Sequence, residues 1–498
     1  MNELELKFRL DPATALRWQQ LFKAQGAKRL RLRARYFDTA DTRLAAASVA
    51  LRLRLEGRRW VQTLKAAGDS AVHRLEHEVA VPSRGGEPPA LDITRHEGSP
   101  ALDRLRQALG DLPATALEPR YETDVQRSTV MLRGFDGSGV EAALDIGKVV
   151  AGEHEAPIVE LELEHVAGPA QAVFQRAQEA LGLGGMWLSS ISKAEQGERL
   201  RQGGPGAAVK AAPLQLPRHA TGATLLRSVL HSALAQILPN TSVVAEGRAD
   251  SEHIHQARVG LRRLRTALRE LSDFSPHIDP AWEPALAATF SALGESRDSQ
   301  AVADAVQPLL EAAGAPKTRW TPTVVADPVE AVRDPEFQRA LVGVLALAHA
   351  GDEAYTPLTE GEVLSHIGGH LKRLHRQVLK DGQRFMRLPI ERQHRVRKRA
   401  KRLRYLSEFA WPLWPARRVE RYLDELKPVQ DALGHHADCA VAAAKFTQDA
   451  LADPAAQFAA GYLTAHLAVT GRAAHQQLRR LAKAEPYWKQ PPLRRSAP

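Results

Sequence analysis

Acidic and basic residues alternate with leucines at the start of the chain. Glu3, Glu5 and Lys7 are two residues apart, so they would share one face of a strand, while Leu4 and Leu6 would share the other. Like charges along one strand face are unfavourable unless opposite charges or bound ions lie near them. Carboxylate oxygens suit Mg²⁺ or Mn²⁺, and lysine and arginine suit phosphate oxygens. The pattern indicates metal and phosphate chemistry.

The same alternation recurs further along the chain. The later rows are Arg52 and Arg54, then Arg74, Glu76 and Glu78, then Glu160, Glu162 and Glu164. A solvated strand face explains any single row, but repeated rows favour strands that enclose their charged faces in an antiparallel barrel. Segments 3–9, 50–55, 74–81, 140–146 and 158–165 are the predicted strands.

The order of these motifs resembles the CYTH, or triphosphate tunnel metalloenzyme, family over about residues 1–200. The residues that carry the resemblance are Glu3 to Lys7, Tyr36 to Thr39, Leu51 to Arg54, Thr63 to Lys65, Arg74 to Glu78, Thr123 to Arg127, Leu144 to Gly147, Glu160 to Glu164, Ser192 and Lys193. The resemblance implies an eight-stranded antiparallel tunnel.

The resemblance also implies roles for individual residues. It implies metal ligation by Glu3, Glu5, Glu160 and Glu162, with Glu76, Glu78 and Asp145 as further inward carboxylates. It implies phosphate binding by Lys7, Arg52, Arg54, Lys65, Arg127 and Lys193. Two ions, Mg²⁺ or Mn²⁺, would act there: one would neutralise the triphosphate, and the other would activate a water for in-line attack.

A basic helical motif occurs twice in the second half of the chain. At 100° per residue, the following basic side chains form one narrow stripe on each of two helices: His255, Arg258, Arg262 and Arg265, and again His394, Arg397, Lys401 and Arg404. Acids that would soften the repulsion are missing from both stripes, so an anionic ligand is expected, with a solvated face as the alternative. Aromatic residues for base stacking are scarce, which favours a bare phosphate chain over nucleic acid.

This part of the chain resembles the CHAD family, the conserved-histidine α-helical domain, over about residues 218–485. The carrying residues are His255 to Arg265, Leu293 to Asp298, His394 to Tyr405 and Leu426 to Gly434, with Gln300 as a departure where an Asp is usual. The resemblance implies two repeated four-helix bundles that bind inorganic polyphosphate. The combination resembles bacterial CYTH-CHAD inorganic triphosphatases.

Composition and charge separate the two parts. Residues 1–203 contain 28 Lys+Arg and 28 Asp+Glu, which leaves 40 and 30 of the totals of 68 and 58 for residues 204–498. We expect an α+β multidomain chain: a tunnel domain over 1–203 with flanking helices, a linker over 204–217, an all-helical domain over 218–485 with repeats at 218–311 and 359–485, and a tail over 486–498. Proline-rich residues 312–358 would be an irregular connection between the repeats.

The expected function is metal-dependent hydrolysis of inorganic triphosphate or polyphosphate, with the helical domain holding polyphosphate. A non-enzymatic polyphosphate-binding protein of polyphosphate granules and an adenylate cyclase are the alternatives. The single cysteine, Cys439, fits a core position in a reducing compartment, and no segment predicts a membrane span or targeting peptide. A cytoplasmic location follows, and the oligomeric state stays open.

Overall fold

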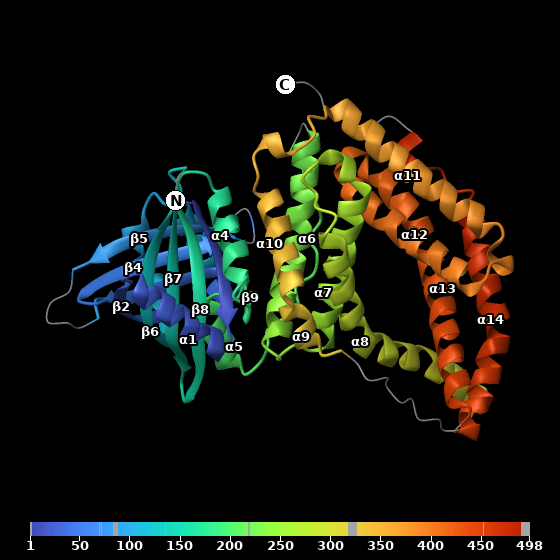
Figure 1. The fold of residues 1–498 in the computed structure, drawn as a ribbon, viewed down its shortest axis with the longest axis horizontal. Coiled ribbons are helices and arrows are strands. Elements are labelled where there is room, and N and C mark those ends of the chain that lie inside the picture. Colours follow the sequence, from blue (N-terminus) through green and yellow to red (C-terminus); the bar gives the residue numbers. More distant parts are fainter. Residues whose placement is uncertain are drawn as a thin grey trace.

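The computed structural model of the chain describes residues 2–68, 70, 72–82, 88–134, 136–217, 220–316, 326–451 and 453–489, without the side chains of residues 2, 3, 74 and 295–301. Figure 1 shows a strongly curved sheet on one side and a larger set of helices on the other. We call residues 2–203 the sheet region and residues 220–489 the helical region. None of the helices in these ranges is long and apolar enough to cross a membrane.

In the described sheet region, nine strands form one antiparallel sheet with the order β5-β4-β3-β2-β6-β7-β8-β1-β9. The strands are β1 (Asn2–Leu10), β2 (Lys28–Asp38), β3 (Val49–Glu56), β4 (Arg59–Ala67), β5 (His73–Val81), β6 (Glu118–Arg133), β7 (Gly139–Ala151), β8 (His154–Ala167) and β9 (Met186–Leu188). The flanking helices are α1 (Pro12–Ala24), α2 (Arg43–Ala46), α3 (Pro100–Leu109), α4 (Gln171–Leu181) and α5 (Lys193–Gln202). All five predicted strands are confirmed.

The predicted eight-stranded barrel is not confirmed as such. β1 pairs with β8 over Glu5–Arg9, and it meets β5 through only three residue pairs, at Asn2, Glu3 and Leu4. Beyond these pairs β1 separates from β5 and pairs with the short strand β9 instead. The antiparallel sheet with flanking helices is therefore confirmed, while its two ends join over a short stretch only.

Alternation along β1 separates the core from the charged face. Leu4, Leu6, Phe8 and Leu10 are buried in a cluster that includes residues of α4, such as Phe174. Glu5 and Lys7, at alternate positions, instead line a cavity on the concave side of the sheet. A glycine in β7 permits close strand packing there, because a Cβ at Gly147 would lie 2.1 Å from the backbone oxygen of Asp124.

The helical region consists of long helices. They are α6 (Gly222–Ala245), α7 (Ser251–Glu270), α8 (Trp282–Ala312), α9 (Pro328–Arg333), α10 (Pro335–Ala348), α11 (Glu360–Gly382), α12 (Ile390–Ala410), α13 (Ala416–Asp449) and α14 (Pro454–Leu481). The repeated basic motif lies on α7 and α12, as predicted.

The two repeated four-helix bundles are not confirmed, because α8 belongs to both halves. Leu286 and Leu293 of α8 lie in the main core with α6 and α7. Farther along the same helix, Val302 and Val306 pack in a second cluster with residues of α13 and α14. Cys439 is fully buried in that cluster, which confirms its predicted core position.

The prediction of an irregular connection over residues 312–358 is wrong where the structure describes that segment. α9 and α10 are regular helices, and Asp327 and Asp334 cap their amino ends. Pro328 and Pro335, which suggested irregularity, each occupy the first helical turn, where a proline has no hydrogen bond to lose. Residues 317–325 lie outside the described part.

α10 and α6 join the helical region to the sheet region. Figure 1 shows α10 between α4 and α6. Gln338 accepts a hydrogen bond from the backbone N–H of Leu188 (2.8 Å), and the Arg333 guanidinium lies 3.8 Å from the ring centre of Trp187. Val209, in the predicted linker, exchanges two hydrogen bonds with the Asn240 side chain (3.1 and 2.8 Å). The two regions therefore form one packed unit.

Three histidines meet at this interface: His73 of β5, His231 of α6 and His349 after α10. The His349 ring centre is 4.6 Å from that of His231 and 5.2 Å from that of His73. Its Nδ1 donates to the carbonyl of Leu345 (2.9 Å), so its Nε2 accepts from the hydroxyl of Ser70 (3.0 Å). Burial lowers the pKa of His349 to about 3 and that of His231 to about 4.

We expect this interface to lower the free energy of unfolding as the pH falls below about 6.5. The folded-state pKa of both imidazoles lies below the unfolded value of about 6.5, so the unfolded chain takes up protons first as the pH drops below that value. Between about pH 7 and about pH 4.5 the wild type should lose about 5 kcal/mol more unfolding free energy than a His231→Gln, His349→Gln variant, about half of it from each imidazole. Urea unfolding at both pH values measures this, and parallel losses would contradict it.

Candidate metal and phosphate site

Strand register brings charged residues into rows on the concave face of the sheet. Arg127 of β6 pairs with Asp145 of β7, Asp145 pairs with Glu160 of β8, and Glu160 pairs with Arg9 of β1. In the next row, Glu162 of β8 pairs with Lys7 of β1. Because side chains alternate along strands, all of these residues point to the same face.

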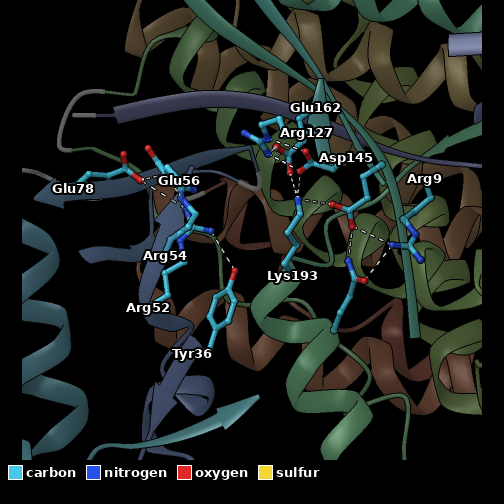
Figure 2. A network of polar contacts seen from close by, with 12 residues as sticks. Arg9, Tyr36, Arg52, Arg54, Glu56, Glu78, Arg127, Asp145, Glu162 and Lys193 are labelled. Carbon is cyan, nitrogen blue, oxygen red and sulfur yellow. Dashed lines mark hydrogen bonds and ion pairs between the residues drawn. The ribbon is translucent and has the colours of Figure 1, made fainter. Parts of the chain in front are cut away.

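Lys193 connects the three carboxylates of these rows. Its Nζ lies 2.8 Å from Asp145 Oδ2, 2.9 Å from Glu160 Oε2 and 2.7 Å from Glu162 Oε1. Lys193 is the first residue of α5, whose amino end is capped by Ser192. Arg127 donates to both oxygens of Asp145 (2.7 and 2.6 Å) and to Glu162. Figure 2 shows this network between β6, β7, β8 and α5.

The cations keep the buried carboxylates ionised. Burial alone would raise the pKa of Glu160, but Lys193, Lys7 and Arg9 outweigh it and lower that pKa to about 2. Glu162 follows the same pattern: Lys193 and Arg127 overcome the effect of burial and hold its pKa well below the usual range. Burial lowers the pKa of Lys193, and its three carboxylate partners raise it well above the usual range.

The three carboxylates fit a divalent metal ion. One oxygen from each of Asp145, Glu160 and Glu162 lies within 4.8 Å of the others, and this is the one such group in the described part of the chain. The donors are all hard oxygens, which suit Mg²⁺ or Mn²⁺. The structure therefore brings together Glu160 and Glu162, which were predicted as ligands, and Asp145, which was predicted as a further inward carboxylate.

The opposite wall carries the remaining predicted phosphate ligands. Arg52 donates to the hydroxyl of Tyr36 (3.2 Å), Arg54 pairs with Glu78 (3.0 Å), and Lys65 pairs with Glu76 (2.8 Å). Figure 2 shows Arg52 and Arg54 across from the cluster around Lys193. A cavity of about 1390 Å³ lies between the two walls. Glu76 and Glu78, which were predicted as carboxylates of the metal site, lie on this wall and not with the other three.

Glu5 belongs to a third row, with residues that sequence reasoning left out. Glu5 pairs with Glu164 of β8, and Glu164 pairs with Glu141 of β7. Burial, followed by the charge of Glu5, raises the pKa of Glu164 to about 7. All three side chains line the cavity. The side chain of Glu3 lies outside the described residues.

Arg9 and Gln196 are polar residues of the site that the sequence prediction missed. Both contact Glu160 Oε1, Arg9 at 3.1 Å, and Arg9 also donates to Gln196 Oε1 (3.1 Å). A signal for Arg9 existed, since it continues the row of Glu3, Glu5 and Lys7 by two residues. No comparable signal marks Gln196, which lies one helical turn after Lys193.

The basic stripes lie in the helical region, away from this cavity. Arg258, Arg262 and Arg265 surround the ring of Phe290 at 5.0, 5.1 and 5.4 Å, and Arg265 pairs with Glu283 (2.8 Å).

On α12, Arg397 faces Asp438 at 3.7 Å and Arg404 pairs with Glu408 (2.7 Å). Glu408 lies four residues after Arg404 on the same helix, so the expectation that both stripes lack such acids is wrong there. Glu283 and Asp438, from other helices, offset further charge of the stripes. His255, His394 and Lys401 are half-buried members of the stripes, and their binding role stays a prediction.

Family comparisons agree with the two regions. The CYTH domain model matches residues 1–197, and the CHAD domain model matches residues 228–447. An inorganic triphosphatase of Haemophilus influenzae is 31% identical over 203 residues, which cover 40% of this chain and 54% of that protein. The match thus spans about half the length of the curated relative.

Two solved structures are also similar. The CHAD domain from the plant Ricinus communis is 27% identical with a TM-score of 0.46, covering 55% of this chain and 96% of its own. A putative adenylyl cyclase from Hippeastrum, described as having a dominant triphosphatase activity, is 18% identical with a TM-score of 0.28, covering 40% and 96%. Residues 1–197 are thus a CYTH domain, and residues 228–447 are a CHAD domain.

Proposed function

We propose that the CYTH domain hydrolyses inorganic triphosphate or the end of a polyphosphate chain with the help of Mg²⁺ or Mn²⁺. The observation that carries this proposal is the cavity with two different walls. Asp145, Glu160 and Glu162 gather on one wall, and Arg52, Arg54 and Lys65 line the other. The similarity to an inorganic triphosphatase supports the same chemistry.

The residues of both walls divide the work. Asp145, Glu160 and Glu162 would hold the metal, which when bound offsets phosphate charge and activates an attacking water. Arg52, Arg54, Lys65 and Lys7 would bind phosphate oxygens and fix the chain for in-line displacement. Their ion pairs with Glu76 and Glu78 would exchange for pairs with phosphate. No side chain needs to act as a nucleophile.

The predicted second ion belongs, in this proposal, to the row of Glu5, Glu141 and Glu164. Three carboxylates in adjacent strands repel one another unless a cation or a proton lies among them. The raised pKa of Glu164, to about 7, reflects that repulsion together with burial. Glu3, on the same strand as Glu5, was predicted as a ligand of the same kind.

The CHAD domain would bind polyphosphate through the stripes on α7 and α12. The phenyl ring of Phe290 holds three guanidinium groups close together, and Glu283 offsets only part of their charge. Binding there would raise the local concentration of phosphate chains at the CYTH domain. A protein that binds polyphosphate on granules without cleaving it is the second candidate, since these stripes do not depend on the tunnel chemistry.

We expect Glu162→Gln to lower Mg²⁺-dependent phosphate release from triphosphate at least about 100-fold, because it removes a charged metal ligand and the partner of Lys193 and Arg127. Glu122→Gln is the matched control, since Glu122 forms an exposed ion pair with Arg35 on the outer face of the sheet. Phosphate release with and without the metal measures both variants.

Full activity of Glu162→Gln would contradict the assignment of Asp145, Glu160 and Glu162 as the metal site. Wild-type protein that releases no phosphate from triphosphate, yet binds long polyphosphate, would establish the granule-binding alternative. Formation of cyclic nucleotide from ATP would instead establish an adenylate cyclase.

The stripe on α12 gives a separate test. We expect Lys401→Gln with Arg404→Gln to weaken binding of long-chain polyphosphate about tenfold and to flatten its salt dependence, because fewer counterions are released. Arg29→Gln with Arg33→Gln removes the same charge from exposed positions of β2 and serves as control. Titration at low and high salt compares the variants. An equal loss in both would contradict a binding stripe.

A further inference from the structure

The ammonium group of Lys193 lies where the three carboxylates would hold a metal ion. Its contacts with Asp145, Glu160 and Glu162 measure 2.7–2.9 Å, and they match the three donors of an ammonium group to three acceptors. The side chain is only 12% exposed. Mg²⁺ binds oxygens at about 2.0–2.1 Å, so a metal ion held by the same three oxygens would overlap this nitrogen.

The carboxylates of this cluster already have enough cations. Asp145, Glu160 and Glu162 are contacted by Arg127, Lys193 and Arg9, and the buried Lys7 lies opposite Glu162 in the strand register. A divalent cation added beside them would face these four cations in a largely buried place, where charges interact strongly. Metal binding therefore requires that one cation leave.

Lys193 is the cation best able to leave. Arg127 is fixed by two hydrogen bonds to Asp145, and Arg9 is fixed by Gln196 and by the carbonyl of Pro157 (3.2 Å). Lys193 has a flexible stem and lines the cavity, so its ammonium can move toward bound phosphate. It also begins α5, where the positive end of the helix dipole disfavours a cation.

We propose that the three carboxylates bind either Lys193 or the metal ion, and that triphosphate makes room for the metal by drawing the ammonium into the cavity. The inference rests on the proposed function and adds an order of binding: the metal binds weakly to the free protein and tightly once triphosphate is bound. By linkage the metal strengthens triphosphate binding by the same factor. Lys193 is thus a counter-ion of the free site and a phosphate ligand of the loaded one.

The test is Mn²⁺ binding to metal-free protein in the absence of phosphate. Calorimetry measures the affinity, and the rise of the melting temperature on adding Mn²⁺ measures it independently. We expect Lys193→Met to bind Mn²⁺ at least about tenfold more tightly than wild type and to show the larger thermal shift. Lys193→Arg keeps the charge and should bind as weakly as wild type. Lys193→Gln serves if the methionine variant does not fold.

Lys148→Met is the matched control, because it removes the same charge from an exposed ion pair with Glu155, away from the cavity. Unchanged or weaker Mn²⁺ binding by Lys193→Met would overturn the inference, and so would an equal gain in Lys148→Met. Phosphate release by the wild type is measured separately. Activity of the wild type without a gain in Lys193→Met rejects this inference alone, whereas absence of activity rejects the proposed function.

Discussion

The structure of the CYTH domain depends on keeping three neighbouring carboxylates charged inside a folded sheet. Asp145 and Glu160 are fully buried and Glu162 nearly so, and each would be strongly destabilising without cations. The cations come from three separate elements: Arg127 from β6, Arg9 from β1 and Lys193 from α5. The curvature of the sheet and the position of α5 are therefore tied to the charges of the candidate site.

Sequence alone predicted the charged rows well, because alternation along a strand is a local property. The inward faces of β1, β3, β5 and β8 follow directly from period-two spacing. Which rows meet is a matter of register between strands, and the sequence does not contain it. For that reason the union of Asp145 with Glu160 and Glu162, and the placement of Glu76 and Glu78 on the other wall, came only from the structure.

The helical region shows the same division between local and long-range information. The stripes on α7 and α12 were predictable from a single helical period. Their partners were not, since Phe290, Glu283 and Asp438 come from other helices. Pro335 misled the prediction because a proline inside a helix and a proline at its first turn look alike in sequence. α8 crosses between the halves, so the internal repeat did not translate into two separate bundles.

The interface at β9 has a consequence for how such a protein can be altered. The backbone of Leu188 donates to the carboxamide of Gln338, Trp187 packs against the guanidinium of Arg333, and α6 supplies His231 and Ser232 to the wall of the cavity. The two domains are therefore not independent modules joined by a flexible linker. Any helical domain grafted onto this sheet would have to reproduce those three features at the same positions, and the residues that replaced them would change the lining of the cavity.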